Sequence, residues 1–103
     1  MARKPRPYAL SRRAESDLDS IYAYTAENWS LAQADRYLRD LYAAFGGLAS
    51  GQQIGRDAEL GQNVMKLVVN RHVVYFQKTE RGIVVQRVLH GAMDAPRRLD
   101  PMG

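Results

Sequence analysis

The chain has 103 residues with 15 Lys and Arg against 11 Asp and Glu, which gives a net charge of +4 and a pI near 9.7. This length suits one domain spanning residues 1–103. Because Cys is absent, disulfides, thiolate zinc sites and a cysteine nucleophile are excluded. No apolar run approaches the roughly 18 residues of a membrane span, so we expect a cytoplasmic protein without membrane contact.

Charge is unevenly distributed along the chain. Residues 1–13 carry five basic side chains and no acid, residues 14–59 carry eight acids and three bases, and residues 60–103 carry seven bases and three acids. This asymmetry predicts two electrostatic faces, one of which suits an acidic partner. The alternative is a set of solvated surface charges, since dedicated duplex-binding proteins have a denser basic stripe.

The first half of the chain predicts a short strand and a helix. Tyr8–Leu10 is a short apolar stretch, and the hydroxyl of Ser11 can cap the helix that follows. Apolar side chains then recur at helical spacings of three and four, at Ala14, Leu18, Ile21, Tyr22, Thr25 and Trp29.

A second helix is predicted from Leu31 to a stop at Gly51. Ser30 and Gln33 have the spacing of a capping box, which marks its start. Since the connection between the two helices is only a few residues long, we expect an antiparallel helical hairpin.

The second half predicts a surface loop at residues 51–63 and then three strands. Valine and aromatic residues are enriched in the runs Val64–Val69, His72–Lys78 and Ile83–Leu89. Strict alternation in the last run would place Ile83, Val85, Arg87 and Leu89 on one face and Val84, Gln86, Val88 and His90 on the other. The predicted class is α+β in the order β-α-α-β-β-β, with the helical hairpin packed on one face of a small antiparallel sheet.

Few residue patterns favour catalysis. The two histidines, His72 and His90, lie in separate strands without a neighbouring carboxylate, so we expect no metal site and no cofactor. The carboxylates Glu15 and Asp19 are typical of a solvated helix face. Aromatic residues of the hairpin suit a core or an interface, at Tyr22, Tyr24, Trp29, Tyr37 and Tyr42.

One basic cluster is a candidate site. Arg87 and His90 end the last predicted strand, Arg97 and Arg98 follow it, and Arg56 lies in the predicted loop. Such a cluster can bind phosphate or an acidic protein surface, and it has the residue types that acid–base cleavage of RNA requires. The structural alternative is that Arg87 pairs with a carboxylate across the sheet and that His90 closes the sheet.

Several segments in combination resemble the ParE toxins of bacterial toxin–antitoxin modules. The resemblance covers roughly residues 8–99, and its clearest part is the run from Arg87 through His90, Gly91, Met93 and Asp94 to Arg98 and Leu99. It is also carried by Leu10–Leu18, Ile21–Thr25, Glu27–Trp29, Ala34–Leu38, Gly55–Arg56, Glu59–Leu60 and His72–Phe76.

The resemblance implies a RelE-like fold and a non-enzymatic toxin of a type II toxin–antitoxin system. Such a toxin arrests growth by trapping the cleaved-DNA complex of DNA gyrase. Its implied partner is a ParD-like ribbon-helix-helix antitoxin, which binds operator DNA itself, so that the toxin meets this DNA only through the antitoxin.

Two sets of site residues follow from family position and charge. The candidates for target binding are Arg56, Arg87, His90, Met93, Arg97 and Arg98, and the candidates for antitoxin binding are Tyr22, Trp29, Tyr37, Leu38, Leu41 and Phe45. Ala92 stands where members of the family commonly carry another basic residue.

Two alternatives remain open from the sequence. One is a ribosome-dependent mRNA endonuclease of the RelE type, with Arg87 and His90 as catalysts and Arg56 as phosphate clamp. The other is a decayed toxin that serves as an antitoxin-binding partner. The RelE-type alternative is disfavoured because the C-terminal segment lacks the tyrosines or lysine-rich cluster that such nucleases tend to carry.

Overall fold

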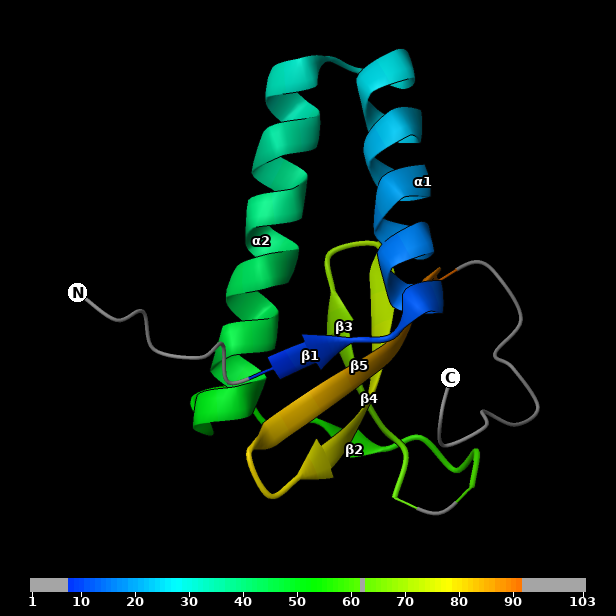
Figure 1. The fold of residues 1–103 in the computed structure, drawn as a ribbon. Helices are drawn as coiled ribbons and strands as arrows, with labels where there is room; N and C mark the ends of the chain where they lie inside the picture. The colour runs from blue at the N-terminus through cyan, green and yellow to red at the C-terminus, as the bar shows by residue number, and fades with distance from the viewer. Residues whose placement is uncertain (1–7, 62, 92–103) are drawn as a thin grey trace.

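The computed structural model describes residues 8–61 and 63–91, in which two helices pack on one face of a five-stranded sheet (Figure 1). The sheet order is β1-β5-β4-β3-β2. The elements are β1 (Tyr8–Leu10), α1 (Arg12–Asn28), α2 (Leu31–Ser50), β2 (Arg56–Asp57), β3 (Met65–Val69), β4 (His72–Thr79) and β5 (Gly82–His90). The predicted α+β class and the helical hairpin are confirmed. Neither described helix is long and apolar enough to cross a membrane.

The helix boundaries follow from local capping chemistry. The side-chain oxygen of Ser11 accepts a hydrogen bond from the N–H of Ala14 at 3.0 Å, and that of Ser30 accepts one from the N–H of Gln33 at 3.0 Å. Each bond satisfies an N–H that has no partner within its own helix. Gly51 ends α2 in the left-handed conformation, with φ of 86°. These observations confirm the predicted helix starts and the predicted stop.

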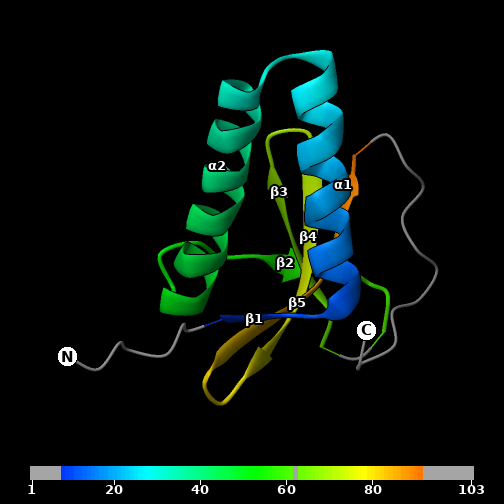
Figure 2. The same cartoon turned by 45° about the horizontal axis from the view of Figure 1, so that its top comes forward.

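The sheet is mixed, which corrects the prediction of an antiparallel sheet. β1 runs parallel to β5, with Tyr8 opposite Ile83 and Leu10 opposite Val85, while the other neighbouring strands are antiparallel. Figure 2 shows β1 leading directly into α1 at the base of the hairpin. The direction of β1 relative to β5 depends on the path of the chain through the elements between them. The three residues of β1 contain no local pattern that predicts this direction.

A short strand lies within the predicted loop 51–63. β2 pairs with β3, with Arg56 opposite Lys66 and Asp57 opposite Met65. Two residues cannot display the period of two by which strands are detected, so β2 escapes prediction. Gly55 precedes it where the chain passes close to Phe76, because a Cβ at this glycine would lie 2.6 Å from Cζ of that ring.

An irregularity in the β4–β5 pairing corrects the predicted faces of the last strand. Tyr75 lies opposite Arg87 and Phe76 lies opposite Val85, so Gln86 is an extra residue in β5. This β-bulge shifts the alternation by one residue. From Arg87 onward, each side chain of β5 lies on the face opposite to the one that strict alternation predicts. Val88 therefore shares the core under the helices with Val85.

Two hydrophobic clusters lie on the two faces of the sheet. The larger one joins the hairpin to the sheet and contains Leu18, Leu41, Phe45, Val74 and Phe76. The smaller one contains Ala58, Val64, Tyr75 and Leu89. Successive side chains along β4 point to opposite faces of the sheet. Tyr75 therefore faces away from the helices, while Val74 and Phe76 face toward them.

Candidate functional site

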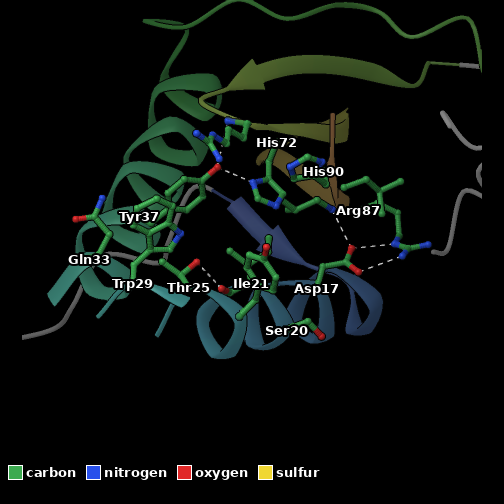
Figure 3. A pocket seen from close by; sticks show the side chains of 14 residues that line it. Asp17, Ser20, Ile21, Thr25, Trp29, Gln33, Tyr37, His72, Arg87 and His90 are labelled. Carbon is green, nitrogen blue, oxygen red and sulfur yellow. Dashed lines mark hydrogen bonds and ion pairs between the residues drawn. The ribbon is translucent and has the colours of Figure 1, made fainter. Parts of the chain in front are cut away.

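An open pocket lies between the hairpin and the adjoining ends of β4 and β5. It has a volume of about 720 Å³ and is lined from α1, the α1–α2 connection, α2, the β3–β4 turn, β4 and β5. Figure 3 shows the side chains that line it. They are Asp17, Ser20, Ile21, Tyr24, Thr25, Trp29, Gln33, Tyr37, Arg71, His72, Arg87, Val88, Leu89 and His90.

The hairpin contributes an aromatic wall to this pocket. Tyr24 and Trp29 are 65% and 67% exposed, although both are large apolar side chains. Trp29 caps the end of α1, where its N–H donates to the carbonyl of Thr25 at 2.9 Å. Exposed aromatic side chains beside a concave surface are typical of a protein interface.

Asp17 on α1 holds the edge of β5. Its carboxylate accepts two hydrogen bonds from the Arg87 guanidinium, at 2.9 and 3.0 Å, and a third from the N–H of Val88 at 2.9 Å. β1 ends at Leu10, so Val88 lies on a stretch of β5 that β1 does not cover, and the carboxylate satisfies an edge N–H there. The carboxylate of Asp17 raises the pKa of Arg87.

The ion pair shows what Arg87 contacts in this structure. This residue lines the pocket, yet its guanidinium is engaged in a bidentate contact. The expected pairing of Arg87 with a carboxylate is therefore observed, but the carboxylate comes from α1 and not from across the sheet. Sequence reasoning did not single out Asp17, because the two residues are 70 positions apart and no local spacing joins them.

A tyrosine and two histidines form the other polar part of the pocket. The Tyr37 hydroxyl lies 2.5 Å from Nδ1 of His72 and accepts a hydrogen bond from the N–H of Arg71 at 3.2 Å. His72 and His90 are opposite each other in the β4–β5 pairing, with ring centroids 5.3 Å apart. Figure 3 shows both rings facing the pocket.

The protonation of this group is biased by burial. Desolvation and the neighbouring His90 lower the pKa of His72, although Asp17 opposes this. Burial also raises the pKa of Tyr37. The neutral form of His72 is therefore favoured in the folded state. No group of three or more potential metal ligands occurs among residues 8–61 and 63–91.

The structure separates the residues expected to bind the target. Arg87 and His90 line the pocket, whereas Arg56 does not. The pairings place Arg56 in one cross-strand row with Arg87, but β3 and β4 lie between them, which is a distance of roughly 14 Å at ordinary strand spacing. Met93, Arg97 and Arg98, together with Ala92, lie outside the described residues.

The residues expected to bind the antitoxin divide into two groups. Trp29 and Tyr37 line the pocket, and the Tyr22 hydroxyl donates to Asp35 of α2 at 2.9 Å, which raises the pKa of Tyr22. The three others are buried in the larger core, so in this structure they hold the hairpin on the sheet and offer no contact surface: Leu38, Leu41 and Phe45.

The sequence did not indicate a binding role for three of the pocket residues. Arg71 and His72 lie in and beside the β3–β4 turn, and Asp17 lies on the polar flank of α1. In the sequence, Asp17 is marked only by its place as a polar residue next to the buried stripe of α1. Many solvent-exposed residues have the same kind of place, so it does not single out Asp17.

Comparison with known proteins places this architecture in a family. The family model described as "ParE toxin of type II toxin-antitoxin system, parDE" matches residues 8–95. The chain belongs to the ParE toxin family. It is 36% identical over 95 residues to Toxin ParE1 of Caulobacter vibrioides, covering 91% of this chain and 98% of that protein.

Further ParE relatives span nearly the whole chain. Toxin ParE1 of Mycobacterium tuberculosis is 36% identical over 94 residues, covering 89% of this chain and 96% of that protein. Toxin ParE of Escherichia coli is 32% identical over 94 residues, covering 89% and 91%. A solved structure described as "Chromosomal ParDE TA system from P. aeruginosa" matches with a TM-score of 0.70 at 22% identity, covering 81% of this chain and 92% of that one. This match supports the ParE-type, RelE-like fold.

Proposed function

We propose that this ParE-family toxin arrests growth by inhibiting DNA gyrase in the cytoplasm and that a ParD-like ribbon-helix-helix antitoxin neutralises it. The family match over residues 8–95 carries this proposal. The structurally similar chain comes from a chromosomal ParDE system, and this origin supports an antitoxin partner. Operator DNA is then reached only through the antitoxin.

The pocket supports a binding role for the toxin. Exposed Tyr24 and Trp29 beside a cavity of about 720 Å³ form an apolar surface that a partner segment can cover. We therefore assign the antitoxin contacts to Trp29 and Tyr37, and to Tyr22, whose hydroxyl joins α1 to Asp35 of α2. The gyrase contacts remain assigned to the basic set of Arg56, Arg87, His90, Met93, Arg97 and Arg98.

A non-enzymatic mode of action fits the state of Arg87. A guanidinium that would stabilise the charge of a phosphorane must offer its N–H groups to the substrate. Here two of these donors are held by Asp17. We therefore propose that the toxin acts by binding gyrase, without chemistry of its own.

The test is a gyrase cleavage assay with the full chain. Toxin free of antitoxin is mixed with gyrase, ATP and supercoiled plasmid, followed by detergent and protease. We expect linear DNA that requires both proteins and that disappears when the antitoxin is added first. Absence of linear DNA would contradict gyrase poisoning.

A second candidate function is ribosome-dependent mRNA cleavage. It is favoured by one observation, the presence of His72, His90 and Arg87 in a single pocket, because acid–base cleavage of RNA needs a base, an acid and a cation. Toxin is incubated with ribosomes and bound mRNA in parallel with the gyrase assay. Cut mRNA without a DNA effect would establish this function in place of the first.

A further inference from the structure

The pocket combines two kinds of surface at its two ends. The hairpin end is apolar and aromatic, with Ile21, Tyr24 and Trp29. The sheet end is polar, with the cationic Arg71 in the β3–β4 turn and the two histidines beside it. Among the described residues, the ion pair in this pocket is formed by Arg87 and Asp17. Arg71 is not part of this ion pair, so its positive charge is available to a ligand.

The hydrogen bonds of the Tyr37 hydroxyl determine which ring nitrogen of His72 can donate a hydrogen bond to a ligand. Its hydroxyl oxygen already accepts from the N–H of Arg71, so the arrangement that uses every polar group has the hydroxyl proton donated to Nδ1 of His72. Nε2 then carries the ring proton. His72 is thus a hydrogen-bond donor in its neutral form and a cationic donor once protonated.

We propose that the Arg71–His72–His90 end of the pocket is a carboxylate subsite. Its occupant is an acidic side chain of the antitoxin, whose neighbouring apolar side chain fills the aromatic end. This inference rests on the proposed antitoxin partner and extends it by naming the chemistry of the bound segment and a proton taken up with it.

The proton uptake follows from charge. The charged and titratable groups that line the pocket with His72 are Asp17 and Tyr24 from α1, Tyr37 from α2, Arg71 from the turn, and Arg87 and His90 from β5. Asp40 of α2 acts on Tyr37. In the free toxin the neutral form of the histidine is favoured. A carboxylate bound next to it favours the imidazolium, so the complex holds more protons than the separate proteins and the affinity rises as the pH falls.

The experiment is calorimetric titration of the full toxin with the antitoxin encoded beside it. At pH 7 the titration is run in Bis-Tris and in Tris, two cationic buffers whose different ionisation enthalpies reveal the number of protons bound. We expect net proton uptake, and a dissociation constant that decreases between pH 8 and pH 6 by up to about tenfold per pH unit.

Two variants locate the effect. Arg71→Gln keeps the backbone bonds of the turn and removes its charge, and we expect about tenfold weaker binding. Arg81→Gln makes the same change in the exposed β4–β5 turn, outside the pocket, and is expected to change affinity less than twofold. His72→Asn keeps an acceptor for Tyr37 and should reduce the proton uptake.

The outcomes separate the two proposals. Binding that is independent of pH, without proton uptake and with equal effects of Arg71→Gln and Arg81→Gln, would overturn the carboxylate subsite while leaving the antitoxin partner intact. Absence of binding at every pH would overturn the antitoxin partner, and the subsite with it. Thermal unfolding of each variant, followed by circular dichroism, identifies a variant that fails to fold.

Discussion

Individual residues explain how the pocket is held open and oriented. Asp17 joins α1 to β5 by three hydrogen bonds, and the Tyr37 hydroxyl joins α2 to the β3–β4 turn and His72. These contacts fix the two walls of the pocket relative to the sheet. Each contact is formed by residues at least 34 positions apart in the chain.

Removing the carboxylate of Asp17 should weaken the fold. Charge-assisted hydrogen bonds contribute about 1.5–3 kcal/mol, and the side chains of Asp17 and Arg87 are 14% and 26% exposed. We expect Asp17→Ala to lower the free energy of unfolding by about 2–3 kcal/mol. Asp17→Asn should cost less, because its side-chain oxygen can still accept from Val88.

Urea unfolding of both variants measures this effect. Asp19→Asn, an exposed carboxylate on the same helix, is the control and should change stability by less than about 0.5 kcal/mol. If Asp17→Ala behaves like this control, the ion pair does not stabilise the fold.

The half-buried position of His72 predicts a pH dependence of stability. Its pKa is lowered in the folded state, so the unfolded chain binds more protons. This contribution to stability is present above the unfolded pKa of about 6.5 and is lost as the pH falls through and below it. We expect the fold to be less stable at pH 5.5 than at pH 7.5. Urea titrations at both values should show a smaller difference for His72→Asn, and an unchanged difference would refute the assignment.

At the scale of elements, local signals define the helices while pairing partners define the sheet. Ser11, Ser30 and Gly51 mark helix ends through bonds or backbone angles within a few residues. β1, β2 and the bulge at Gln86 depend instead on strands that are distant in sequence. Their geometry is therefore a product of packing rather than of local preference.

Two glycines with opposite surroundings test this packing. A Cβ at Gly55 would lie 2.6 Å from Cζ of Phe76 and 2.8 Å from the carbonyl oxygen of Lys66, so Gly55→Ala should destabilise the fold by about 1–3 kcal/mol. A Cβ at Gly46 on α2 would meet nothing within 4 Å. Gly46→Ala should therefore stabilise the fold by about 0.5–1 kcal/mol. Thermal unfolding distinguishes the two, and equal effects would show that the contact with Phe76 is not restrictive.

For the whole molecule, one hairpin provides both core side chains and exposed aromatic side chains beside the pocket. Leu41 and Phe45 are buried against the sheet, while Tyr24 and Trp29 remain exposed beside the pocket. Because the exposed pair buries little surface, we expect it to contribute little to folding, and under the proposed function it remains available to contact the antitoxin.

Trp29→Ala should separate binding from stability. Because Trp29 is 67% exposed, we expect its loss to change the free energy of unfolding by less than about 0.5–1 kcal/mol. Antitoxin affinity should fall by at least about tenfold, as for an aromatic anchor of an interface. Ile54→Ala removes another exposed apolar side chain outside the pocket and is the control. Equal affinities of the two variants for the antitoxin would place the antitoxin elsewhere.

The sequence by itself determined the class of fold, the helical hairpin with its caps, and the three long strands. These features depend on periodicity and on capping hydrogen bonds, and both involve only residues that are close together in the sequence. Only the tertiary structure decided the parallel pairing of β1, the bulge at Gln86, the pairing of Asp17 with Arg87 and the meeting of Tyr37 with His72. Each of these depends on the return path of the chain and on contacts between distant residues, and no spacing along the sequence contains that information.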